Sequence, residues 1–111
     1  MGEYSFGKTL NIVAGADTDV NLLTIPSAKK FTLTEVQIHF PSGCDYNIQL
    51  YFKRGEEQIL PNENYFASDH SPIKVVCNIL YQSGEVIVVH TKNLDASNPY
   101  KVWIFLKGIL E

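Results

Sequence analysis

The strongest constraint on the fold of this chain is a repeated alternation of apolar and polar residues in short segments that are separated by turn residues. In residues 46–53, Tyr46, Ile48, Leu50 and Phe52 share one parity, and the residues between them are mostly polar. A side-chain period of two belongs to a strand with one buried face, and no stretch has a persuasive helical period. The pattern predicts an all-β sandwich or barrel.

Eight antiparallel strands are expected between the turn signals. They cover residues 4–13, 20–25, 30–40, 46–53, 58–60, 73–81, 86–91 and 100–107. Residues 15–19 are expected to form a turn after the first strand, and residues 82–85 a hairpin turn, because Ser-Gly suits a primed turn type. The nearly continuous β-branched run at residues 86–89 predicts a strand that is buried on both faces or covered by a partner.

The strand at residues 30–40 changes phase along its length. Phe31 and Leu33 share one parity, whereas Val36, Ile38 and Phe40 have the other. A bulge near residues 34–35 would place both sets on the core side and bend the strand as it passes between sheets. Eight strands of this spacing, one of them bent, indicate a single-domain β-sandwich of jelly-roll type that spans residues 1–111.

Composition narrows the classes of function. The chain has 111 residues, which is enough for one domain with its own core. Its nine basic residues are scattered and its net charge is −3, so the dense phosphate-neutralising patch of a nucleic-acid-binding protein is missing. Neither a secretory signal nor an apolar run of the ~18 residues that a membrane span needs is visible. We expect a protein made in the cytoplasm, with no nucleic-acid or membrane partner.

The two cysteines are expected to be free thiols. Cys44 falls in a turn, whereas Cys77 lies in the middle of a strand and is predicted to be a buried core residue. Without an export signal, a disulfide between them is not favoured.

No catalytic motif stands out. Asp69, His70 and Ser71 are consecutive, and consecutive loop residues cannot form the relay in which the base lies between nucleophile and acid. The chain is therefore expected not to be an enzyme.

Metal ligands are also sparse. The three histidines, His39, His70 and His90, lie far apart, so zinc binding or a cupin-type metal enzyme ranks low. Asp17 and Asp19 mark an acidic turn with too few oxygens for calcium. No metal or cofactor is predicted.

The last strand is predicted to carry a contact surface. Val102, Ile104 and Leu106 fill one face, which leaves Trp103 and Phe105 on the other. Either the strand packs on both sides within the domain, or Trp103 and Phe105 form an apolar patch for another subunit. Tyr51 is a further candidate for this oligomer or partner contact, as are Tyr65 and Phe66.

The irregular segment at residues 61–72 is the best candidate for a functional loop. Loops of about a dozen residues are usually functional or disordered. The segment could cover one end of the sandwich, contact another subunit, or bind a sugar through its aromatic and polar side chains. The candidate ligand residues are Asn62, Asn64, Tyr65, Phe66, Asp69 and His70.

Residues 31–61 carry a family resemblance. A strand ends in Pro41-Ser42-Gly43-Cys44, an alternating strand follows at residues 46–52, and a glycine turn leads to the apolar-proline stop at residues 58–61. This arrangement resembles small jelly-roll structural proteins of phage and archaeal-virus particles. The resemblance implies a virion component, either a capsid decoration or an accessory head protein, that works as a symmetric oligomer, with trimers as the guess. It carries no functional residue over.

Two hypotheses of different classes follow. The first is a non-enzymatic virion structural protein that assembles into a homo-oligomer or binds another capsid protein. The alternative is a carbohydrate-binding module that uses the exposed aromatic residues of the loop at residues 61–72.

Overall fold

The computed structural model describes residues 2–61 and 63–111, which form eight strands. The strands are β1 (Gly2–Ile12), β2 (Asp17–Thr24), β3 (Phe31–His39), β4 (Ile48–Arg54), β5 (Glu57–Leu60), β6 (Ile73–Tyr81), β7 (Val86–Asn93) and β8 (Tyr100–Leu110). Among the described residues there is no helix long and apolar enough to cross a membrane.

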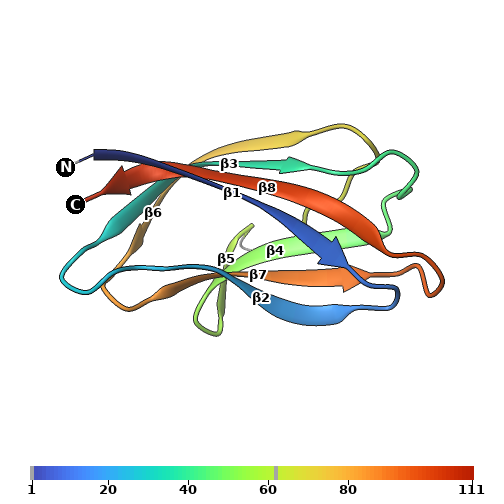
Figure 1. Ribbon diagram of the computed structural model, residues 1–111, viewed down its shortest axis with the longest axis horizontal. Coiled ribbons are helices and arrows are strands. Elements are labelled where there is room, and N and C mark those ends of the chain that lie inside the picture. The colour runs from blue at the N-terminus through green and yellow to red at the C-terminus, as the bar shows by residue number, and fades with distance from the viewer. Residues whose placement is uncertain (1, 62) are drawn as a thin grey trace.

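The strands form two antiparallel four-stranded sheets that pack face to face (Figure 1). Sheet A has the order β1-β8-β3-β6, and sheet B has the order β2-β7-β4-β5. The pairing is nested along the chain, because β1 pairs with β8, β2 with β7, β3 with β6, and β4 with β5. A long hairpin rolled into two sheets is the jelly roll, so the predicted fold is confirmed.

The core lies between the sheets and uses one parity of each strand. In β8 the inward residues Val102, Ile104 and Leu106 are buried, as their alternation predicted. Gly108 continues this inward row, where the ring of Phe31 and the carbonyl oxygen of Thr32 occupy the space that a side chain would need. The glycine therefore allows β3 and the Phe31 ring to approach β8 closely.

The predicted bulge in β3 is present. The register of β3 against both β6 and β8 shifts between Leu33 and Glu35, and this shift turns both apolar sets of the strand toward the core. The strand nevertheless pairs with β6 and β8 along its whole length, so it stays in sheet A. The expected passage between sheets was wrong, because the bulge is absorbed as extra twist within one sheet.

Residues 82–85 form a tight turn, but it does not close a hairpin. The amide of Glu85 donates to the carbonyl oxygen of Gln82, with Gly84 at a positive φ of 81°. The turn joins β6 in sheet A to β7 in sheet B, and these two strands do not pair with each other. Turn chemistry alone cannot tell a hairpin from a connection between two sheets.

Two other predicted boundaries were also wrong. Asp17 and Asp19 belong to strand β2, because β7 is available to pair with them. Tyr46 precedes β4 in a turn with a φ of 61° and is exposed, so the alternation of this strand begins only at Ile48.

The two cysteines are free thiols, as predicted, but their environments are exchanged. Cys44 is fully buried and contacts the carbonyl oxygen of Ser68, whereas Cys77 is only half-buried. Cys77 lies on an edge strand of sheet A, which is less covered than the centre of the sheet.

The run in β7 is buried on both faces within the chain. Ile87 and Val89 point into the core, and Val88 on the opposite face is also buried, with Asn21 and Lys53 as its cross-strand neighbours. The first of the two predicted explanations for this run is confirmed.

Candidate functional site

The candidate contact residues of the strands lie on both outer faces of the sandwich. Trp103 and Phe105 lie on the outer face of sheet A, whereas Tyr51 lies on the outer face of sheet B. Tyr51 therefore cannot extend the Trp103 patch, because the whole thickness of the domain separates them.

On sheet A the exposed residues form cross-strand rows. Trp103 of β8 lies between Thr9 of β1 and His39 of β3, and its ring centroid is 5.2 Å from that of His39. Phe105 lies in the next row, with its ring centroid 6.1 Å from that of Trp103. Trp103 remains 45% exposed even with these neighbours. The result is an open aromatic surface.

On sheet B two polar rows cross β2, β7 and β4. One row places Asp17, Lys92 and Gln49 side by side, and the next places Asp19, His90 and Tyr51 side by side. Asn64 and Tyr65 of the irregular segment line the same cavity as residues of these rows. Together they enclose an open cavity of about 280 Å³ lined by Asp17, Gln49, Tyr51, Asn64, Tyr65, His90 and Lys92.

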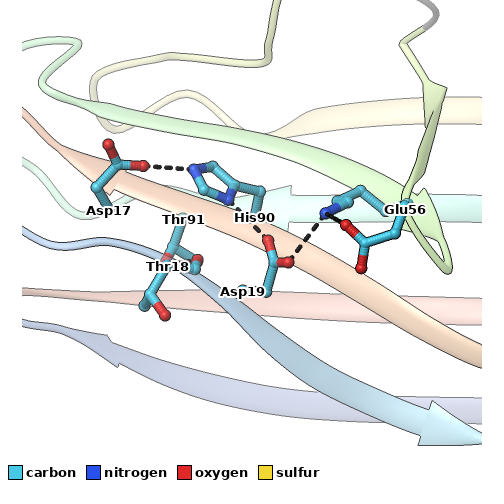
Figure 2. A network of polar contacts seen from close by, with 7 residues as sticks. Asp17, Thr18, Asp19, Glu56, His90 and Thr91 are labelled. Carbon is cyan, nitrogen blue, oxygen red and sulfur yellow. Dashed lines mark hydrogen bonds and ion pairs between the residues drawn. The ribbon is translucent and has the colours of Figure 1, made fainter.

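His90 is held between two carboxylates (Figure 2). Its Nε2 atom lies 2.6 Å from an oxygen of Asp17, and its Nδ1 atom lies 2.7 Å from an oxygen of Asp19. The Tyr51 ring stacks on the imidazole with centroids 4.8 Å apart. The imidazole is thereby fixed in position, with one face covered by tyrosine.

Asp19 also joins this network to Lys53. The Nζ atom of Lys53 donates to the second oxygen of Asp19 at 2.9 Å, and Glu56 lies 3.8 Å from the same nitrogen. Lys53 is only 8% exposed, so its charge depends on these partners. The hydrogen bond from Lys53, followed by that from His90, lowers the pKa of Asp19, and the carboxylate in turn raises the pKa of Lys53.

The irregular segment is tied down at several points. The backbone amide and carbonyl of Phe66 both bond to Leu50, and its ring packs against the core 6.5 Å from the ring of Phe52. A carboxylate oxygen of Asp69 accepts a hydrogen bond from the amide of Gly43. The segment is thus anchored beside β4 of sheet B, while Tyr65 remains exposed at the cavity.

The remaining candidates of this segment are dispersed. Asn64 and His70 have positive φ angles of 67° and 68°, and His70 is exposed. The carbonyl oxygen of Asn64 accepts a hydrogen bond from Gln58. Asn62 lies outside the described residues. Asn64 and Tyr65 therefore meet at the cavity, whereas Phe66 and Asp69 anchor the segment.

Within residues 2–61 and 63–111 no group of three metal-ligating side chains converges. His39 and His90 lie on opposite outer faces of the sandwich. Asp17 and Asp19 both bond to His90, so their oxygens point toward a ring and not toward a common centre.

The sequence did not reveal the polar part of the cavity. Asp17, Gln49, His90 and Lys92 become neighbours only through the register of β2, β7 and β4. The one available signal was parity, since Asp17 and Asp19 share a face and His90 alternates outward from Val89.

Several solved structures share this fold. The capsid structure of the Helicobacter pylori bacteriophage KHP30 matches with a TM-score of 0.60 and 18% identity, covering 96% of this chain and 87% of that chain. The capsid of cyanophage Pam1 matches with a TM-score of 0.58 and 8% identity, over 96% and 83% of the two chains. The crystal structure of FLHE matches with a TM-score of 0.51 and 7% identity, over 97% and 98%. At these identities the likeness establishes the fold. No protein-family model and no curated protein matches the chain.

Proposed function

We propose that this chain is a non-enzymatic structural protein of a virus particle, either a capsid decoration or an accessory head protein. The observation that carries the proposal is the open aromatic surface of Trp103 and Phe105 on sheet A. The jelly-roll topology and its similarity to two phage capsid proteins support the same function. A protein of this kind acts by burying surface against its neighbours and needs no catalytic group.

The mechanism is assembly through the outer face of sheet A. Exposed aromatic residues in a polar surround supply much of the binding energy at protein interfaces. The polar rim here consists of Thr9, Gln37 and His39, which flank the two rings. The partner is a second copy of the chain or another capsid protein, and the place of action is the virion.

The test is the solution mass of the purified protein, measured by light scattering over a concentration series. We expect an oligomer that Trp103→Ala weakens by about thirtyfold, the effect of losing ~2 kcal/mol at an interface hot spot. Leu94→Ala removes an exposed apolar side chain that follows β7 of sheet B, so it is the matched control and should leave the mass unchanged. A strict monomer that also fails to bind capsids would contradict the proposal.

The cavity of sheet B favours a second candidate function, the binding of a saccharide. Tyr65 and Tyr51 offer aromatic rings, and Gln49, Asn64 and Lys92 offer hydrogen-bonding groups around the same cavity. This combination of a few polar groups with aromatic walls is typical of small-ligand sites.

A glycan array tests this second function. Tyr65→Ala should abolish the binding of any glycan that the wild-type protein retains, without changing its solution mass. Tyr46→Ala removes an exposed tyrosine away from the cavity and should have no effect. An array without any bound glycan would reject the saccharide site and leave the structural function standing.

A further inference from the structure

The four edge strands of the two sheets differ in how well they are protected against pairing. A free edge presents unpaired backbone groups to any other strand, and proteins block this with short strands, charges, bulges or proline. β5 is only four residues long and is followed by Pro61. β2 carries Asp17 and Asp19 and a register shift, and β1 carries Glu3 and Lys8.

β6 has fewer of these protections. Like β2 it has a register shift, which lies against β3 between Val76 and Ile79. It is nine residues long, and Lys74 is its one charged residue. Seven of its residues are apolar, namely Ile73, Val75, Val76, Cys77, Ile79, Leu80 and Tyr81. It lies at the end of sheet A beyond β3, and in Figure 1 it runs from the upper margin of the molecule down toward its label on the left.

Both faces of β6 are incompletely covered. On the outer face Val76 is 77% exposed and Leu80 is 40% exposed. On the inner face Val75 and Cys77 are only half-buried. A strand placed beside β6 would therefore cover apolar side chains on both faces as well as the backbone.

One end of this edge is already closed within the chain. The guanidinium of Arg54 donates to the carbonyl oxygen of Leu80 at 2.9 Å and so occupies the backbone there. The open stretch is Ile73 to Ile79, and its midpoint is Val76, the most exposed large apolar residue of the described chain.

We propose that β6 pairs with β6 of a second copy in antiparallel register about a two-fold axis at Val76. This inference rests on the proposed structural function and identifies a second copy of the chain as the partner in one contact of the assembly. The two copies then share one continuous eight-stranded sheet, and the contact is closed because each copy offers the same strand.

The strand is complementary to itself in this register. Val76 lies opposite Val76 of the second copy, and Lys74 lies opposite Asn78, so no like charges face each other. On the inner face Val75 meets Cys77 and Ile73 meets Ile79. Because directly opposed residues share a face of the sheet, inward apolar residues of one copy extend the inward row of the other.

The pairing also orders the aromatic surfaces. A two-fold axis perpendicular to the sheet keeps the outer faces of both copies on the same side. The Trp103 surfaces of the dimer therefore face the same direction and are both available to one capsid surface.

The test is disulfide trapping of the intact protein in a Cys77→Ser background. Val76→Cys places two thiols directly opposite each other across the axis, with Cα atoms about 4.5–5.5 Å apart, which is within disulfide range. Lys74→Cys is the matched control, because its two copies lie four residues out of register, about 13 Å apart. We expect a disulfide-linked dimer on mild oxidation for V76C and not for K74C.

A second variant asks the same question without oxidation. Val76→Lys is expected to weaken the dimer by about tenfold or more, because two like charges then face each other at the axis. The site is exposed, so the monomer should keep its melting temperature. Equal trapping of V76C and K74C, or an unchanged dimer for V76K, would overturn the proposed pairing.

The outcomes separate this inference from the proposed function. If V76C is trapped while Trp103→Ala leaves the oligomer and capsid binding intact, the β6 contact stands and the sheet A face is the wrong assembly surface. If V76C is not trapped while Trp103→Ala dissociates the oligomer, only the β6 pairing is wrong.

Discussion

The outer faces of sheet A and sheet B are built on strands of the same geometry, yet they carry opposite chemistry. On sheet B the charged side chains find partners inside the chain, with Asp19 bonded to both His90 and Lys53. On sheet A, Val76 is largely exposed and Trp103 is 45% exposed. The polar network on sheet B links β2, β7 and β4 within the domain, whereas the outer face of sheet A is the contact surface of the function proposed above.

If the outer face of sheet A is free for contacts, the stability of the monomer must come from the core between the two sheets. Gly108→Ala tests this and has the largest expected effect. A Cβ atom there would overlap the carbonyl oxygen of Thr32 and would lie 2.5 Å from the Phe31 ring. Backbone cannot yield as a flexible side chain can, so we expect a loss of ~3 kcal/mol in the free energy of unfolding. Denaturant unfolding measures it.

Gly7→Ala is the matched control on the outer side of the same sheet. Its added methyl group would meet the Phe105 ring at 3.4 Å, an ordinary contact. We expect a change within ~1 kcal/mol. A similar loss for both variants would mean that the two sides of sheet A contribute equally to stability.

Asp19→Asn should break the network of sheet B and have the next largest effect. The amide cannot pair with the charges of Lys53 and His90, and Lys53 is nearly buried. We expect the melting temperature to fall by a few degrees, with no change in oligomer mass. Trp103→Ala should lower the oligomer mass and leave the melting temperature unchanged. Calorimetry and light scattering on both variants therefore test the contrast between the two faces.

The difference in melting temperature between wild type and Asp19→Asn should depend on pH, and this is a smaller effect. The pKa of Asp19 in the folded chain lies below its ordinary value, mainly because of the hydrogen bond from Lys53. Its stabilisation is therefore fully present above the unfolded aspartate value of about 4 and is lost as the pH falls through the lowered folded pKa. We expect the gap in melting temperature between wild type and D19N to be constant near neutral pH and to shrink below pH ~4. A gap that widens in acid would contradict this assignment.

Glu35→Gln on sheet A should have the smallest effect. Glu35 accepts a hydrogen bond from Gln37 and lies 3.6 Å from the exposed Lys74, and these contacts lower the pKa of its carboxyl group. Exposed pairs contribute little to stability. We expect no measurable shift in melting temperature, and a fall as large as that of D19N would end the contrast between the faces.

The fold could be predicted largely from side-chain parity. All eight strands were found, and the phase change between Leu33 and Val36 revealed the bulge of β3, because burial imposes a period of two. The errors at Asp17 and Tyr46 arose where local turn chemistry competed with pairing. A strand partner decided Asp17, and a positive φ decided Tyr46.

The candidate sites could be predicted only where one strand or one segment supplies the residues. Trp103 and Phe105 follow from the alternation of β8 alone. The cavity of sheet B needs the register of three strands, which places His90 opposite both Asp19 and Tyr51 from distant parts of the sequence. Periodicity specifies which face a residue occupies, but it does not specify which residues are its neighbours.

The pairing of β1 with β8 sets how the domain responds to mechanical force. Gly2 lies opposite Leu110, so both ends of the strand pair are at the same end of sheet A. Tension applied between these two ends loads the interstrand hydrogen bonds one after another, and the pair opens like a zipper at low force. Tension applied along two paired strands in opposite directions loads many bonds at once. We therefore expect the domain to resist shear through its sheets far better than pulling at its ends.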